Sequence, residues 1–129
     1  MLEKTKAFSG FAVNDLAKAK EFYGEILGVG VKVLDEENGL LELELAGGER
    51  PTLVYAKEDL KPANYTILNF QVDDVEKAVD ELTERGVEFE RYPGSETETD
   101  EKGVFRGGGP LIAWFKDPAG NVLSVIEAD

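Results

Sequence analysis

One segment of the chain occurs twice. Residues 11–28 and residues 70–86 share phenylalanine, valine, aspartate, lysine and alanine in the same order, and the two copies begin 59 positions apart (70 − 11). A repeat of this length predicts two similar supersecondary modules. We therefore expect a single domain made of two modules, at residues 6–57 and 65–129.

Each module is predicted to be a β-α-β-β-β unit. Asp15 and Asp74 are suited to cap helix N-termini, and Gly28 and Gly86 stand where the apolar helical periodicity stops. Runs with strand character accompany both helices. The predicted strands are 6–13, 31–34, 41–45 and 52–56 in the first module, and 66–72, 87–92, 111–116 and 121–127 in the second.

The segment 93–110 interrupts the parallel between the modules. Its first part is charged, and Phe105 and Arg106 precede three consecutive glycines. An irregular segment of this length in a compact domain is usually a binding loop or a disordered one. Because the segment carries an aromatic ring and a guanidinium group, we favour a binding loop, which would cover a bound ligand as a lid. In such a lid, Arg106 could hold an anionic group.

The composition limits the function classes. The 129 residues include 27 acidic and 14 basic ones, a net charge of −13, and no histidine or cysteine. This charge disfavours nucleic acids and anionic membranes as partners, and it suits either plain solubility or a cationic ligand. The commonest general base and the cysteine nucleophile are absent. No segment resembles a membrane span or a signal peptide, so we expect a cytoplasmic protein.

Three motifs resemble the vicinal oxygen chelate superfamily. They are Asp-Leu opening the first helix, Glu-Phe-Tyr-x-x-Ile-Leu-Gly closing it, and Asp-Pro-Ala-Gly-Asn before the last strand. That superfamily holds glyoxalase I, extradiol dioxygenases, fosfomycin resistance enzymes and bleomycin resistance proteins. The resemblance implies an α+β fold of two tandem β-α-β-β-β modules that form incomplete barrels around a cleft, with the helices outside. It also implies a homodimer, with or without exchange of modules.

In metal-bearing members of the superfamily, ligands lie on the first and last strands of each module. The corresponding positions in this chain are Phe8 and Ile67 on the first strands, and Val54 or Tyr55 and Ser124 on the last strands. Phenylalanine and isoleucine have no ligand atom, and serine and tyrosine are poor ligands for a divalent cation. The resemblance therefore implies a member without a metal site and without a cofactor.

Strand alternation indicates which side chains face the cleft. If Phe115 packs under the helix, Trp114 faces the cleft, where its indole could stack on a flat or cationic ligand. Asn69, Gln71 and Ser124 are polar residues on the same inferred face, which a ligand, water or one another could satisfy. The apolar candidates could instead be core. The candidate ligand-binding residues are Phe8, Tyr55, Ile67, Asn69, Arg106, Trp114 and Ser124.

We interpret the chain as a metal-independent protein that binds an aromatic or cationic small molecule, similar in kind to bleomycin resistance proteins. One alternative is a lyase, isomerase or dioxygenase whose metal has non-standard ligands. The carboxylates to consider for it are Glu42, Glu44, Glu58 and Asp59. Another alternative is a structural or regulatory subunit whose acidic surface binds a basic partner. The sequence singles out no catalytic residue.

Overall fold

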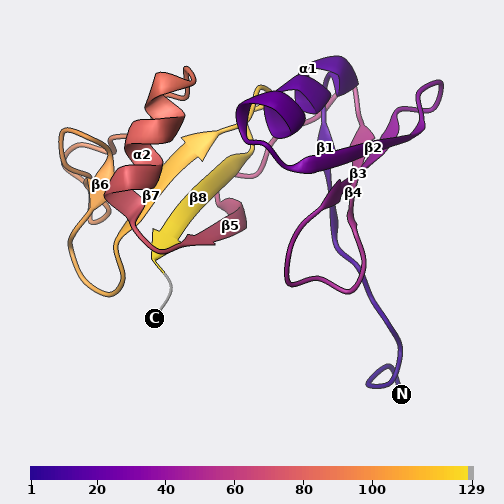
Figure 1. Ribbon diagram of the computed structural model, residues 1–129, viewed down its shortest axis with the longest axis horizontal. Helices are drawn as coiled ribbons and strands as arrows, with labels where there is room; N and C mark the ends of the chain where they lie inside the picture. Colours follow the sequence, from indigo (N-terminus) through magenta and orange to yellow (C-terminus); the bar gives the residue numbers. More distant parts are fainter. Residues whose placement is uncertain (128–129) are drawn as a thin grey trace. The chain divides into compact units, whose positions relative to one another are not determined.

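The chain divides into two compact units, residues 1–62 and 63–129, and the computed structural model describes residues 1–127. Each unit has one four-stranded sheet and one helical segment (Figure 1). The predicted α+β class with two β-α-β-β-β modules is confirmed, and neither sheet closes into a barrel within the described residues. The last two positions of the predicted second module lie outside them.

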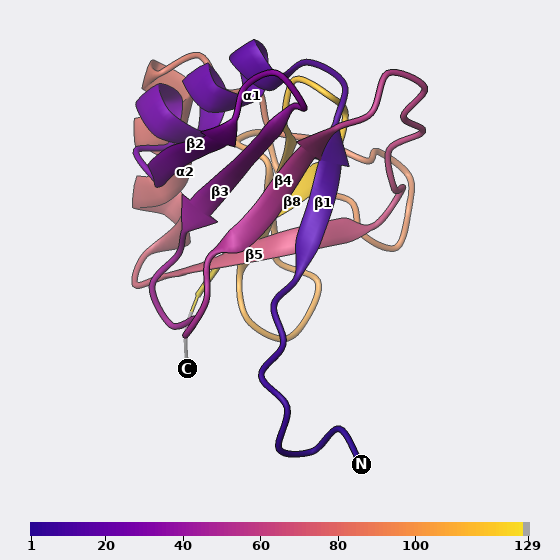
Figure 2. The same ribbon diagram turned by 90° about the vertical axis from the view of Figure 1, so that its right-hand side faces the viewer.

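Unit 1 contains the first sheet. Its elements are β1 (Gly10–Val13), α1 (Leu16–Glu21), the π-helical turn η1 (Phe22–Ile26), β2 (Gly30–Asp35), β3 (Leu40–Glu44) and β4 (Thr52–Ala56). The strand order is β1-β4-β3-β2, as Figure 2 shows. Strands β1 and β4 are parallel, and the other neighbours are antiparallel. The first strand is shorter than predicted, so Phe8 precedes it.

Unit 2 repeats this topology. Its elements are β5 (Thr66–Val72), α2 (Val75–Glu84), β6 (Val104–Phe105), β7 (Ile112–Lys116) and β8 (Val122–Glu127). The strand order is β5-β8-β7-β6, with β5 parallel to β8. Helix α2 lies across one face of this sheet (Figure 1). No helix within residues 1–127 is long and apolar enough to span a membrane.

The predicted helix caps form in both units. Asp15 accepts a hydrogen bond from the Lys18 amide and Asp74 from the Lys77 amide, both at 3.1 Å. These bonds satisfy amides at the first turn that have no partner within the helix. The first helix changes from α to π geometry at Phe22 and ends, as predicted, before Gly28.

Each helix covers an apolar face of its sheet. In unit 1, Leu41, Leu43 and Val54 are fully buried on that face, and Tyr23 from the helical segment is buried with them. In unit 2 the buried side chains of this layer are Val75, Val79, Val104, Ala113, Phe115, Leu123 and Val125. Since strand side chains alternate, the residues between these lie on the opposite, helix-free face of each sheet.

The predicted strand at 87–92 is wrong. Only one isolated bridge forms there, between Phe89 and Phe115, and Tyr92 has a φ of 44°. A positive φ takes the chain out of the extended conformation, so a strand cannot continue through Tyr92. The edge strand of unit 2 is instead β6, which lies inside the segment 93–110.

Candidate functional site

The helix-free face of unit 2 places three candidate residues in one row across the sheet. Trp114 on β7 is directly opposite Ser124 on β8, and Ser124 is directly opposite Asn69 on β5. The neighbours of Trp114 on its strand, Ala113 and Phe115, are fully buried on the helix side. The three side chains therefore project from the same face, which carries no helix.

Three aromatic rings gather at the β7 end of this row. The rings of Tyr92 and Phe105 each lie with their centroids 5.7 Å from that of Trp114, at interplanar angles of 58° and 47°. These are favourable separations for tilted aromatic pairs. Trp114 is half-buried. We call Tyr92, Phe105 and Trp114 the aromatic platform.

Tyr92 contributes a neutral ring to the platform. Its burial and the nearby Glu90 carboxylate raise the pKa of the Tyr92 phenol above its ordinary value, against a smaller opposing effect of Lys116. The Glu90 carboxylate is itself paired with the Lys116 ammonium at 3.1 Å. A tyrosine phenol with its ordinary pKa of about 10 is already uncharged at physiological pH, and the raised pKa of Tyr92 keeps it so.

Ser124 and Asn69 form a hydrogen bond within the row. The Ser124 hydroxyl donates to Asn69 Oδ1 at 2.5 Å. Ser124 is fully buried and Asn69 is exposed, so a buried polar group is satisfied by an exposed one. The face thus combines an aromatic platform with one oriented amide.

Arg106, a candidate for holding an anionic group, forms two ion pairs. Its guanidinium donates to Asp100 at 2.9 Å and to Glu76 of α2 at 2.6 Å. Lys102 forms a second link to α2, with Asp80 at 3.0 Å. The segment 93–110 is therefore tied to the helix by ion pairs, and the Arg106 guanidinium is shared between two carboxylates.

Two further candidates, Ile67 on β5 and Phe8 before β1, lie outside the row. Ile67 is at a bulge, because the β5–β8 register shifts between Thr66 and Leu68. Phe8 is 55% exposed, and the Arg50 guanidinium carbon lies 5.0 Å above its ring. Strand pairing within the two sheets does not bring either residue next to the aromatic platform.

Unit 1 has a helix-free face of its own. Tyr55 on β4 lies there, opposite Ala12 on β1, and is 40% exposed. Glu42 shares this face and is opposite Lys32 on β2. A carboxylate with a lysine directly across the ladder is the arrangement of an ordinary polar sheet surface.

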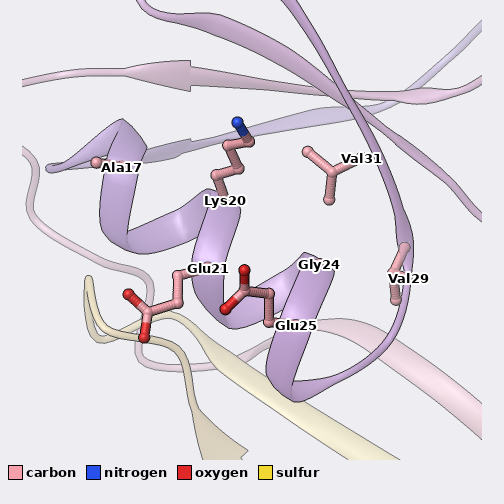
Figure 3. Close-up of a pocket in the computed structure, with 7 residues that line it drawn as sticks. All are labelled: Ala17, Lys20, Glu21, Gly24, Glu25, Val29 and Val31. Carbon is pink, nitrogen blue, oxygen red and sulfur yellow. The ribbon is translucent and has the colours of Figure 1, made fainter.

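A shallow hollow of about 440 Å³ lies beside the helical segment of unit 1. Figure 3 shows Lys20, Glu21 and Glu25 on the helix, with Val29 and Val31 on the segment across from it. Three of its seven lining residues are exposed and charged. It has no aromatic ring, so it lacks the stacking surface found in unit 2.

The family model for the glyoxalase/bleomycin resistance protein/dioxygenase superfamily matches residues 8–125, almost the whole chain. The chain belongs to this superfamily. The family assignment predicted from the three motifs is thus confirmed, and the duplicated sheet-and-helix units are those of a glyoxalase-like fold.

Relatives of this glyoxalase-superfamily chain include the uncharacterized protein YraH of Bacillus subtilis, 29% identical over 89% of this chain and 91% of that protein. The fold is also similar to TnmS3, an antibiotic binding protein from Streptomyces sp. CB03234, with a TM-score of 0.68, 23% identity and coverage of 98% of both chains. The fosfomycin resistance protein FosX of Listeria monocytogenes has a TM-score of 0.66 and 18% identity, covering 98% of this chain and 92% of that one.

The residues at the superfamily's metal-ligand positions do not fit a divalent cation. Phe8 and Ile67 carry no donor atom, and the Ser124 hydroxyl is engaged with Asn69. The strand pairing gives Leu53 as the counterpart of Ser124 in the first module. Leu53 pairs with Gly10 as Ser124 pairs with Asn69, and Gly10 is the repeat equivalent of Asn69. Within residues 1–127, no three acidic, histidine or cysteine side chains gather in a way that could hold a metal.

Two platform residues were not among the candidates drawn from the sequence. Tyr92 was assigned to a strand, and Phe105 to a lid. The available signal was their aromatic character close to a residue that favours turns, with Pro93 directly after Tyr92 and Gly107 two positions after Phe105. Their contacts with Trp114 depend on the turn of the chain at Tyr92 and on the pairing of β6 with β7, which no local pattern predicts.

Proposed function

We propose that this protein binds a flat aromatic small molecule on the helix-free face of unit 2, without requiring a metal ion. The observation that carries the proposal is the aromatic platform, in which a half-buried Trp114 is flanked by two further rings. Flat ligands stack on such rings through dispersion and quadrupole interactions. The antibiotic-binding and resistance proteins of similar fold are consistent with it.

The charge of the chain favours a neutral or cationic ligand over an anionic one. The net charge is −13, and two cations of unit 2 are already paired, Lys116 with Glu90 and Arg106 with Asp100. An anionic ligand would meet long-range repulsion from the chain, whereas a cationic aromatic ligand is attracted and also gains from the ring faces.

A titration with 9-aminoacridine, a flat cationic dye, tests the proposal. Trp114 is the chain's single tryptophan, so quenching of its fluorescence reports stacking directly. We expect saturable quenching in the wild type. By dialysis, Trp114→Ala should weaken binding about tenfold or more, since truncating a stacked aromatic anchor typically costs over 1 kcal/mol. Trp114→Phe, which keeps a ring, should lose less.

Tyr65→Ala is the matched control. Tyr65 is an exposed aromatic residue, 68% accessible, and it is not one of the three rings of the platform. Its removal should leave 9-aminoacridine binding unchanged, which separates stacking at the platform from non-specific attraction to an acidic surface. Equal binding by the wild type and Trp114→Ala would overturn the proposal.

A further inference from the structure

We propose that Asn69 donates a hydrogen bond to the ligand, so that this face selects flat aromatic compounds carrying an acceptor oxygen such as a ring carbonyl. The inference rests on the proposed function, because it concerns the same face. It adds the chemical class of the ligand and a residue that determines specificity.

The contact with Ser124 orients the Asn69 amide. Ser124 Oγ lies 2.5 Å from Asn69 Oδ1, and between two oxygens only the hydroxyl can donate. The carbonyl end of the amide is thereby turned toward β8, and the NH2 end is turned away from it. Among residues 1–127, nothing accepts a hydrogen bond from Asn69 Nδ2.

A comparison with Gln71 shows why the fixed orientation of the Asn69 amide favours ligand binding. It is the next residue of β5 on the same face and lies opposite Ile126, an apolar residue that cannot orient an amide. Its longer side chain must lose rotamer freedom before it can bond to a ligand. Asn69 is already held by a buried hydroxyl, so it presents a donor at a smaller entropic cost.

The row across the sheet also sets a size for the ligand. Trp114 and Asn69 are separated by one strand, so their backbones lie two strand spacings apart, about 10 Å. A single ring stacked on Trp114 does not reach the amide. A fused tricyclic compound with an acceptor on its edge can contact the ring and the amide together.

The pair 9-fluorenone and fluorene tests the acceptor requirement. The two compounds have the same three fused rings and differ in a carbonyl group against a methylene group. Equilibrium dialysis with the full chain measures both affinities. We expect the wild type to bind 9-fluorenone about five- to tenfold more tightly than fluorene, the effect of roughly one net hydrogen bond.

Asn69→Asp is the decisive variant. The carboxylate still accepts from Ser124 but has no N–H to donate, so the preference for 9-fluorenone should disappear while fluorene binding stays unchanged. Gln71→Glu makes the same charge change two residues along on the same face, and it should leave the preference intact. Circular dichroism checks that both variants are folded.

The outcomes separate this inference from the proposed function. Equal affinities of the wild type for the two compounds would overturn the acceptor requirement while the platform stands. A preference that survives in Asn69→Asp would overturn the role of Asn69. If neither compound binds, the inference is wrong, and the 9-aminoacridine titration then shows whether the proposed function falls as well.

Discussion

At the scale of single residues, a glycine controls the shape of the aromatic platform. A Cβ atom added at Gly107 would lie 2.5 Å from Phe105 Cε1 and 2.6 Å from Phe105 Cζ. Such separations do not occur between carbon atoms that are not bonded, so the ring would have to move. The missing side chain at position 107 is thus what allows Phe105 to stay beside Trp114.

Gly107→Ala should displace the Phe105 ring and leave the fold intact, because the atom that must yield is the free end of one side chain. We expect a red shift of Trp114 emission, as the indole loses a neighbour and gains water, and a several-fold weaker binding of 9-aminoacridine. Fluorescence spectra and the titration described above measure both effects.

A double-variant cycle checks the cause. Phe105→Leu removes the ring that the added methyl group would strike, so introducing Gly107→Ala into that variant should have little further effect. If Gly107→Ala weakens binding equally with and without the Phe105 ring, the close approach is not the reason.

At the scale of elements, the segment 93–110 is an ordered strap held against α2. Asp100 organises it, because its carboxylate accepts hydrogen bonds from the Lys102 and Val104 amides and from Arg106, each at 2.9 Å. Its burial opposes ionisation, but these hydrogen bonds and the Arg106 charge outweigh that effect and lower the pKa of the Asp100 carboxyl. The ionised carboxylate is therefore the form that stabilises the strap.

Asp100→Asn should lower the melting temperature by a few degrees at pH 7, since one of its hydrogen-bond acceptors and its charge are lost. The folded-state pKa of Asp100 is depressed, so its stabilisation is fully present above the unfolded pKa of about 3.9 and disappears as pH falls through the folded value. The gap between wild type and variant should close in thermal unfolding measured from pH 7 to pH 2.

Asp59→Asn is the matched control in unit 1. Asp59 pairs with Lys57 at 3.0 Å, and the hydrogen bond from Lys57 lowers its pKa as well, but both side chains are exposed. An exposed pair stabilises little, so the melting temperature should not change measurably. If the difference in melting temperature between the wild type and Asp100→Asn stays constant with pH, the charge of Asp100 is not the source of that difference.

At the scale of the whole molecule, the net charge of −13 acts against the folded state through self-repulsion. The ion pairs among residues 1–127 lie at partly exposed side chains, where each contributes modestly. Repulsion spread over 27 acidic residues should therefore dominate the response to salt.

Raising NaCl from about 10 mM to about 0.3 M at pH 7 should increase the melting temperature, because the Debye length falls from roughly 30 Å to under about 10 Å and screens the repulsion. Thermal unfolding at several salt concentrations measures this. Near the isoelectric point the same salt series should have little effect. A melting temperature that falls with salt at pH 7 would mean that the ion pairs outweigh the repulsion.

Most of the secondary structure and the family follow from the amino-acid sequence alone. The strands at 52–56 and 66–72 form where alternation predicts them, and Asp15 and Asp74 cap the helices as their positions indicate. Alternation and capping depend on residues only a few positions apart, so they can be read from the chain directly. Because the sequence contains the repeat, the local patterns predicted for the first module are also predicted for the second.

The composition of the candidate site, in contrast, depends on tertiary packing. Tyr92 leaves the extended conformation, β6 forms inside the predicted lid, and Phe105 reaches Trp114 because β6 pairs with β7. The contact between Ser124 and Asn69 likewise depends on the register of two strands 55 positions apart in sequence. Register and ion pairs between distant segments arise from packing of the whole unit, and no local pattern in the sequence carries them.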